Sequence, residues 1–198
     1  LRRAFAAAAA ASPLAPPNET IQNARQAALD VLKPSPKDLE HGFVGHLDEL
    51  VPSLLAQDDI YGADRLTQAV KTKELGVVAK ETRWEVQFLW WNSETQYNWL
   101  DGMVRTALLI ENPIYIEKAH TRIEHLLATQ DADGYLGIYA PDLRFNFSGE
   151  NGELWAQASL FRVLLGWYEA TGDERALESV RRAVGVTMVA YPMGKSHP

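Results

Sequence analysis

The chain has no cysteine, which removes several kinds of chemistry from its 198 residues. Without thiols it has no disulfides, no thiolate zinc site and no cysteine nucleophile of its own. The absence indicates no particular compartment, because a cysteine-free chain tolerates oxidising and reducing surroundings alike.

Positive charge is also scarce, since 19 Lys and Arg stand against 26 Asp and Glu, a formal net charge of −7. A surface that binds nucleic acid needs concentrated positive charge, so we expect no nucleic-acid partner. Apolar runs long enough to cross a bilayer are missing, so we expect no membrane partner either. With 46% hydrophobic residues and six tryptophans, the composition is typical of a globular domain with a sizeable core.

The first 17 residues differ from the rest. The stretch LRRAFAAAAAASPLAPP has two arginines, an alanine-rich run and small residues from Ala11 to Ala15, an order typical of a secretory signal. A disordered, alanine-rich tail explains the same composition. We exclude residues 1–17 from the fold and leave their cleavage open. A signal would make the protein secreted or periplasmic, and otherwise we expect a cytoplasmic protein.

Helical patterns fill most of the remaining chain. Residues 18–32 have apolar residues at helical spacing, and Pro34 closes this segment. Another helical stretch is predicted around residues 47–55, interrupted by Pro52. Residues 59–85 show no clean period, so no element is predicted there.

The helical pattern becomes clear from residue 92 onward. Ser93 is predicted to be an N-cap, and Gln96, three residues later, to complete a capping box. The helix should run to about Glu111. Apolar residues cover most of its circumference, which predicts burial nearly all round, through Trp99, Leu100, Met103, Val104, Ala107 and Leu108.

The next helix starts at once, because Asn112 followed by Pro113 is a typical N-cap and first helical residue. Its apolar residues lie on one face and its charged residues mostly elsewhere. We therefore expect an outer, amphipathic helix with the stripe Ile116, Ala119, Ile123 and Leu127.

The same pair of helices recurs. Residues 153–170 are apolar on most sides, and Asp173 is predicted to cap an amphipathic helix over residues 174–188, with the stripe Leu177, Val180, Val184 and Met188. Aligning the caps Asn112 and Asp173 gives a period of 61 residues (173 − 112). Such a hairpin cannot cover its inner helix alone and needs neighbours. The predicted fold is therefore all-α, a ring of helical hairpins.

The connection over residues 130–152 is long, glycine-rich and aromatic, which is typical of a functional loop. Both inner helices are entered through polar and aromatic segments, residues 90–94 and 147–153. If the inner helices run parallel, these entrances lie at the same end of the ring.

Three stretches between about residues 40 and 190 carry a family resemblance: WNSETQYNWLDGMVRTALLI, LLATQDADGYLGIYAP and GELWAQASLFRVLLGWYEATGDERALESVRRA. Their most specific pieces are Gln130 with Asp133-Gly134-Tyr135-Leu136, then Glu153-Leu154-Trp155 and the run from Tyr168 to Asp173. In this order, they resemble the family 127-like glycoside hydrolases, whose characterised type is a β-L-arabinofuranosidase.

The resemblance implies a six-hairpin (α/α)6 catalytic barrel followed by β-sandwich domains. Residues 18–198 would form about half of this barrel, so we expect an N-terminal fragment truncated at Pro198. The family's zinc-bound cysteine nucleophile and Glu acid/base would lie beyond Pro198. We therefore expect zinc only in the full-length protein, no cofactor in these residues and no activity from the fragment alone. Ser159 stands about where family members often have a sugar-binding histidine, which leaves the sugar specificity open.

Six residues near the helix entrances are predicted to contact the substrate: Trp91, Glu94, Tyr135, Phe147, Glu150 and Glu153. Aromatic rings pack against the C–H faces of sugars, and glycosidases commonly use paired carboxylates. Each residue also has an ordinary explanation. Core packing accounts for at least one of Trp90 and Trp91, and the helix dipole favours carboxylates in a first turn. The catalytic residues and the oligomeric state stay open.

Other polar residues have structural explanations. Asp101 is predicted to pair with Arg105 at i+4, and Asp131 and Asp133 to shape a turn in which Gly134 takes a positive φ. His120 and His125 are five residues apart and are expected on different helix faces. No metal site is therefore predicted from them.

The leading hypothesis is a glycoside hydrolase that removes terminal sugars from glycans, with β-L-arabinofuranosides as the substrates implied by the resemblance. A glycosidase should gather Trp91, Tyr135, Phe147 and acids at the N-termini of the inner helices. Two alternatives stay open. One is an α-helical solenoid that binds another protein, and the other is a polysaccharide lyase or epimerase on a similar toroid.

Overall fold

The computed structural model describes residues 22–24, 26, 27, 30, 40–67, 77–80, 83–86, 90–145, 152–192 and 194. The predicted leader, residues 1–17, and most of the helix predicted over residues 18–32 lie outside these described residues.

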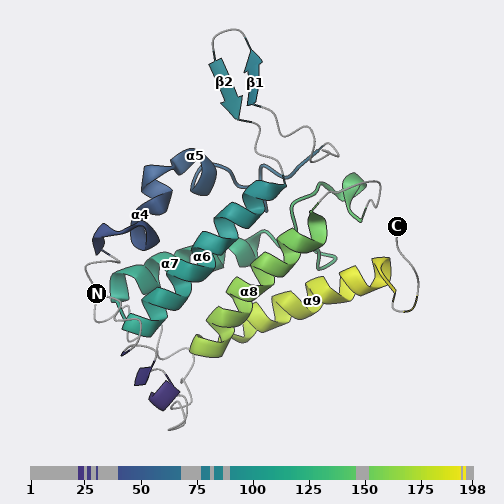
Figure 1. Cartoon of the computed structure of the whole chain (residues 1–198). Coiled ribbons are helices and arrows are strands. Elements are labelled where there is room, and N and C mark those ends of the chain that lie inside the picture. Colours follow the sequence, from purple (N-terminus) through teal and green to yellow (C-terminus); the bar gives the residue numbers. More distant parts are fainter. Residues whose placement is uncertain are drawn as a thin grey trace.

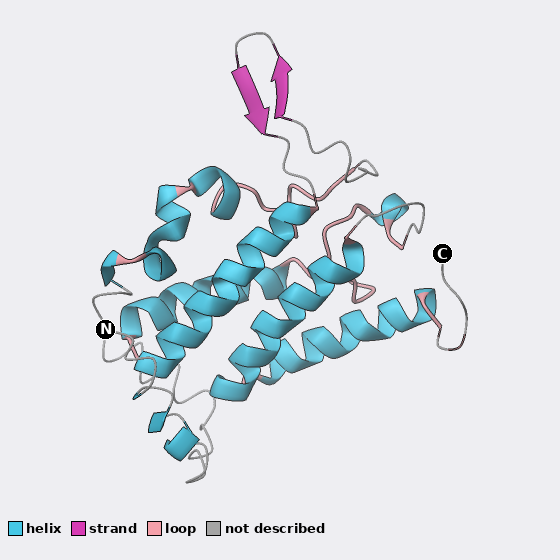
Figure 2. Ribbon diagram, in the orientation of Figure 1, coloured by secondary structure: helices cyan, strands magenta, loops and turns pink. Residues whose placement is uncertain are grey.

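The described part of the chain is mostly helical (Figures 1 and 2), which confirms the predicted class. Four long helices form its body, with two short helices before them and a two-stranded hairpin between. In chain order the elements are α4 (Phe43–Leu50), α5 (Pro52–Leu55), β1 (Val77–Lys80), β2 (Arg83–Val86), α6 (Trp91–Ile110), α7 (Pro113–Ala128), the 3-10 helix η2 (Pro141–Leu143), α8 (Glu153–Thr171) and α9 (Glu174–Ala190).

The antiparallel hairpin of β1 and β2 is an element that the sequence did not predict. Val77 lies opposite Val86, and Lys80 opposite Arg83. Each strand has only four residues, too few for an alternating pattern to stand out. In Figure 1 the hairpin projects from the helical body at the end where α6 begins.

The N-caps of α7 and α9 are confirmed. The Asn112 side chain accepts hydrogen bonds from the backbone N–H groups of Ile114, at 3.1 Å, and Tyr115, at 3.4 Å. The Asp173 side chain accepts one from the N–H of Arg175 at 3.1 Å. Both helices therefore begin where the sequence predicts. Such caps are predictable because the capping side chain bonds only to the first turn of its own helix.

The capping box predicted at Ser93 and Gln96 is wrong. Helix α6 begins two residues before Ser93, and its N-cap residue, Trp90, makes no side-chain cap. The Ser93 hydroxyl instead donates back to the Trp90 carbonyl at 2.6 Å. The Gln96 amide donates to the carbonyls of Leu54, at 2.8 Å, and Asp58, at 2.7 Å. Gln96 thus serves a tertiary contact that its spacing from Ser93 does not show.

The inner helices α6 and α8 pack side by side and run in the same direction (Figure 1). The Asp101 carboxylate of α6 accepts a hydrogen bond from Arg162 of α8 at 2.8 Å. The Arg105 guanidinium lies over Gly166, where a β-carbon would come within 3.0 Å of Nη2. Both pairs are 61 residues apart (162 − 101 and 166 − 105), the period between the two caps. Equivalent positions of the two helices are therefore neighbours.

Helices α6 and α7 form one hairpin, and α8 and α9 form a second beside it (Figure 2). Helices α4 and α5 pack against α6 on the flank away from α8. The described residues thus contain two adjacent hairpins, which agrees with the repeat. Whether further hairpins complete a toroid stays a prediction.

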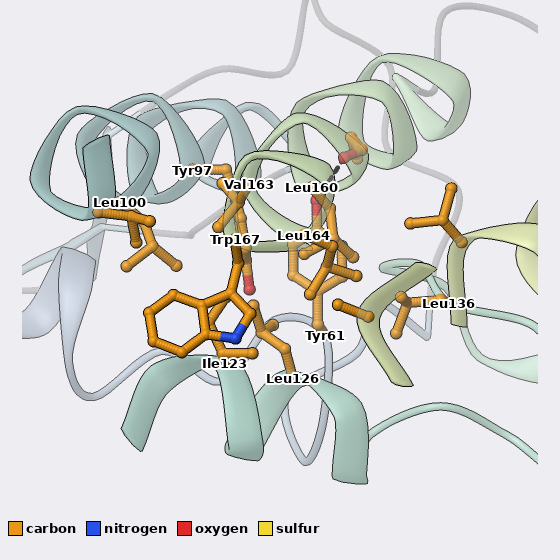
Figure 3. Packing of buried hydrophobic residues seen from close by; sticks show 14 of the residues in the cluster. Tyr61, Tyr97, Leu100, Ile123, Leu126, Leu136, Leu160, Val163, Leu164 and Trp167 are labelled. Atoms are coloured by element: carbon orange, nitrogen blue, oxygen red, sulfur yellow. Dashed lines mark hydrogen bonds between the residues drawn. The ribbon is translucent and has the colours of Figure 1, made fainter. Parts of the chain in front are cut away.

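The core lies between the four long helices and the loop that follows α7 (Figure 3). Its labelled side chains come from three of these helices and from loops: Tyr97 and Leu100 of α6, Ile123 and Leu126 of α7, Leu160, Val163, Leu164 and Trp167 of α8, and Tyr61 and Leu136 of the loops. Tyr61 also donates from its hydroxyl to the Ala156 carbonyl at 2.6 Å, which ties the loop before β1 to α8.

Two predictions about helix faces are wrong. Helix α6 is not buried nearly all round, because Asn98, Gly102 and Arg105 are exposed on one side. In α9, Val184 and Met188 were predicted to face the core, but they are 38% and 51% exposed. The buried residues of α9 are Ala176, Ser179, Val180 and Ala183. Small side chains let α9 approach its neighbours closely, and a hydrophobic stripe does not identify such a face.

Candidate functional site

The N-terminal ends of α6 and α8 lie at the same end of the helical body (Figure 1), as expected for parallel inner helices. We call this region the shared N-terminal end. There the Trp90 indole lies against Gly152, the N-cap residue of α8, and a β-carbon at position 152 would overlap the ring. Gly152 also has a φ of 64°, in the left-handed region that favours glycine.

Glu153, the first residue of α8, is the buried carboxylate of this end, with 1% of its surface exposed. The Tyr135 hydroxyl donates to Oε1 at 2.8 Å, and the backbone N–H of Phe145 donates to Oε2 at 2.7 Å. Tyr135 is fully buried as well. Two predicted contact residues are therefore brought together, and they contact each other.

Burial raises the pKa of the Glu153 carboxyl above its ordinary value, although the hydrogen bonds from Tyr135 and Phe145 and the charge of Arg144 act against the shift. Burial also raises the pKa of the Tyr135 hydroxyl, and the neighbouring Glu153 adds to it. A carboxyl with a raised pKa is the type that general acids use. Here, however, protein groups already donate to both of its oxygens.

Arg144 holds the other side of Tyr135. Its guanidinium carbon lies 3.9 Å from the centre of the Tyr135 ring, and its nitrogens bind Asp131 and Asp133. Asp131 also accepts from Arg65 at 2.6 Å, which ties the loop before β1 to the loop after α7. Charge-assisted bonds from Arg65 and Arg144 therefore hold this loop, and Tyr135 with it, in place.

Phe145 has a φ of 55°, a conformation that is uncommon for a bulky residue. Its ring makes edge contacts with Tyr135 and Tyr191, at centroid distances of 5.7 and 5.9 Å. The bond from its N–H to Glu153 helps to hold this backbone conformation. The sequence did not indicate this backbone conformation of Phe145, because backbone strain leaves no residue pattern when the residue is not glycine.

The α6 side of the shared N-terminal end has a polar cluster that sequence reasoning missed. Asn92 is fully buried, and its Nδ2 donates to the Leu54 carbonyl at 3.1 Å and to Oδ2 of Asp58. Burial raises the pKa of Asp58 to about 6; the Asn92 hydrogen bond lowers it, and the charges of Asp64 and Asp59 raise it. These groups lie far apart in the chain, so no local motif reveals them.

The remaining predicted contact residues are less defined. Trp91 opens α6, and its side chain lies outside the described part of the structure. Glu94 is half-buried in the first turn of α6. Phe147 and Glu150 lie outside the described residues. A sugar-binding role for these four residues therefore stays a prediction, as it does for Tyr135 and Glu153.

Residues with predicted structural roles behave as expected. Gly134 has a φ of 99°, and Asp133 accepts from the N–H of Tyr135 at 2.9 Å, which forms the predicted turn. Asp101 pairs with Arg105 at 2.8 Å. The sequence therefore identified correctly which of these polar groups serve local geometry.

The histidines of α7 serve separate contacts. The His120 ring stacks on Trp167 at 5.8 Å, and His125 bonds to Asp59 at 2.8 Å. Within the described ranges, no group of three or more His, Cys, Asp or Glu side chains could hold a metal ion. Among the same residues, no helix is both long and apolar enough to cross a membrane.

Comparisons with protein-family models, with curated proteins and with solved structures find no match. The resemblance to the family 127-like hydrolases therefore stays a hypothesis that depends on the sequence stretches alone.

Proposed function

We propose that this chain forms part of the sugar-binding end of a glycoside hydrolase built from helical hairpins. The substrates proposed are terminal sugars of glycans, with β-L-arabinofuranosides as the first class to test. Further hairpins would complete an (α/α)6 toroid around the inner helices α6 and α8. The family's cysteine nucleophile is not among these residues, because the chain has no cysteine.

The observation that carries this proposal is the shared N-terminal end of α6 and α8. Parallel inner helices in register, with Asp101 next to Arg162, are what a ring of repeated hairpins needs. At that end Glu153 has a raised pKa and lies among the rings of Tyr135, Phe145 and Tyr191. Acids and aromatic rings are the groups that recognise sugars. Glu153 and Tyr135 are buried, so in this proposal they support the residues that contact the sugar.

Binding of a simple sugar to the whole chain tests the proposal. We expect methyl β-L-arabinofuranoside to cause saturable NMR shifts of the backbone amides of residues 92–97 and 153–157. Methyl β-D-glucopyranoside is the matched control and should cause smaller shifts. An aryl β-L-arabinofuranoside measures hydrolysis in parallel, through release of its aryl alcohol. If neither sugar shifts these amides, the proposed sugar site is wrong.

A solenoid that binds another protein is the second candidate, and one observation favours it. Leu154 and Trp155 of α8 are 45% and 57% exposed, and large exposed apolar side chains are typical of protein contacts. Saturable sugar shifts in a Trp155→Ser variant would separate the sugar site from this surface. The third candidate, a lyase, would give an unsaturated product that absorbs ultraviolet light, which hydrolysis does not produce.

A further inference from the structure

The end of α5 is bound to the first two turns of α6 by two amide side chains. Nδ2 of Asn92 donates to the Leu54 carbonyl, at 3.1 Å, and to the Asp58 carboxylate. Nε2 of Gln96 donates to the same Leu54 carbonyl, at 2.8 Å, and to the Asp58 carbonyl, at 2.7 Å. Two side chains of α6 therefore hold residues 54–58 in place.

One atom of this cluster is unsatisfied. Asn92 is fully buried, and its Oδ1 has no hydrogen-bond partner among the described residues. A buried amide oxygen without a donor destabilises the structure, because it has lost the hydrogen bonds that water would give it. An ionised Asp58 cannot supply the donor, because a carboxylate only accepts hydrogen bonds. A protonated Asp58 can, since a carboxylic acid donates its O–H to an amide oxygen while its carbonyl accepts from the amide nitrogen.

The charges around Asp58 favour that proton. Burial raises the pKa of Asp58 most, the hydrogen bond that Asn92 donates lowers it, and the charges of Asp64 and Asp59 raise it. Two nearby basic side chains, His125 of α7 and Arg65, lower the pKa of Asp59. Neither is among the groups that shift the pKa of Asp58. Two more charged side chains belong to the packed helices, namely Arg122 of α7, whose charge acts on Tyr97, and Glu94 of α6. Among the described residues, Asp58 has no salt bridge.

We propose that Asp58 and Asn92 form a proton-operated latch, in which a proton on Asp58 supplies the donor that Asn92 Oδ1 lacks. The latch holds the end of α5 on α6 more tightly in mildly acidic solution than in neutral solution. It lies at the shared N-terminal end, next to Trp91 and Glu94 in the chain. The pH would therefore change how often the end of α5 opens away from α6 in that region. It does not depend on any sugar-binding function.

The size of the effect follows from proton linkage. The pKa of Asp58 is raised from 3.8 to about 6, so the closed form binds the proton more tightly than an open form. The stabilisation is fully present below the unfolded pKa and is lost as the pH rises through about 6. Between pH 7.5 and pH 5, the constant for local opening should fall about tenfold on acidification.

Two measurements test the latch. The first is a ¹³C NMR titration of the Asp58 carboxyl in the unmodified chain, for which we expect a midpoint near pH 6. A midpoint below about pH 4.5, close to that of an ordinary aspartate, would overturn the proposal. This titration needs no variant, so it can overturn the proposal even if a substitution prevents folding.

The second measurement is hydrogen exchange of the Ala56 and Gln57 amides, which bond to the Pro52 carbonyl at 2.9 and 2.8 Å. After correction for intrinsic exchange, their protection should rise about tenfold from pH 7.5 to pH 5. Asp58→Asn should abolish this change. The exposed residue Asp142 gives a matched control, because Asp142→Asn makes the same chemical change elsewhere. Equal pH responses in the unmodified chain and in Asp58→Asn would also overturn the latch.

Discussion

The six-membered ring of Trp90 lies against the α-carbon of Gly152, so that the entrance of one inner helix touches the entrance of the other. This contact joins the residue before α6 to the residue before α8. It leaves no room for a side chain at position 152. The close approach of the two helix entrances therefore depends on a glycine.

Gly152→Ala should destabilise the protein by about 2–4 kcal/mol, because the methyl group would meet the Trp90 ring and the positive φ would be strained. Urea unfolding followed by circular dichroism measures the loss. Gly102→Ala is the control, since nothing lies within 4 Å of a β-carbon there and α6 should gain about 0.5–1 kcal/mol. Equal effects at the two glycines would contradict the contact.

Tyr135→Phe removes the hydroxyl that donates to Glu153, and it should cost about 1–3 kcal/mol because a buried carboxylate loses one of its hydrogen bonds. Tyr168→Phe deletes the same atom from a half-buried tyrosine and serves as the control. Chemical denaturation of both variants gives the difference. A Tyr135→Phe variant as stable as the original chain would show that this hydrogen bond contributes little.

Asp48 of α4 is 8% exposed at its side chain and pairs with Lys118 at 2.6 Å and Arg122 at 3.3 Å of α7. Asp48→Ala should cost about 2–3 kcal/mol, because two partly buried cations lose the buried carboxylate that they share. Glu49 contacts the same lysine at 3.7 Å but is 66% exposed. Glu49→Ala should therefore change stability by less than about 0.5 kcal/mol. Thermal melting of the two variants tests whether burial decides the value of the ion pair.

Glu153 should make the protein less stable as the pH rises. Its folded pKa is raised by burial, so the folded state binds the proton more tightly than the unfolded state. The stabilisation is present below the unfolded pKa of about 4.3 and is lost as the pH rises through the folded pKa. Glu153→Gln should remove this component, so the Tm of the variant minus the Tm of the original should increase from pH 4 upward. A constant difference across that range would contradict the raised pKa.

Much of the fold was predictable from local patterns. Asn112 and Asp173 cap their helices as expected, since a cap bonds to the first turn that follows it in the chain. The 61-residue period between these caps reappears in space as the pairing of Asp101 with Arg162. Two stacked hairpins were therefore evident from the sequence, whereas the short strands of β1 and β2 were not.

The candidate site was less predictable, because its groups meet through tertiary contacts. Gln96 was assigned to a capping box but binds carbonyls at the end of α5. Asn92 and Asp58 are 34 residues apart, and neither lies in a motif. Tyr135 and Glu153 were both singled out, but the sequence did not show that each is the other's hydrogen-bond partner.

The sequence by itself determined where α7, α8 and α9 begin, that Asn112 and Asp173 cap α7 and α9, and that the hairpin repeats. These properties depend on neighbours within a turn or on periodicity. Only the tertiary structure decided which faces are covered, as Val184 and Met188 show, and which carboxyl groups lose water, as Glu153 and Asp58 show. Burial and pKa depend on everything packed around a group, and that environment is assembled from distant parts of the chain.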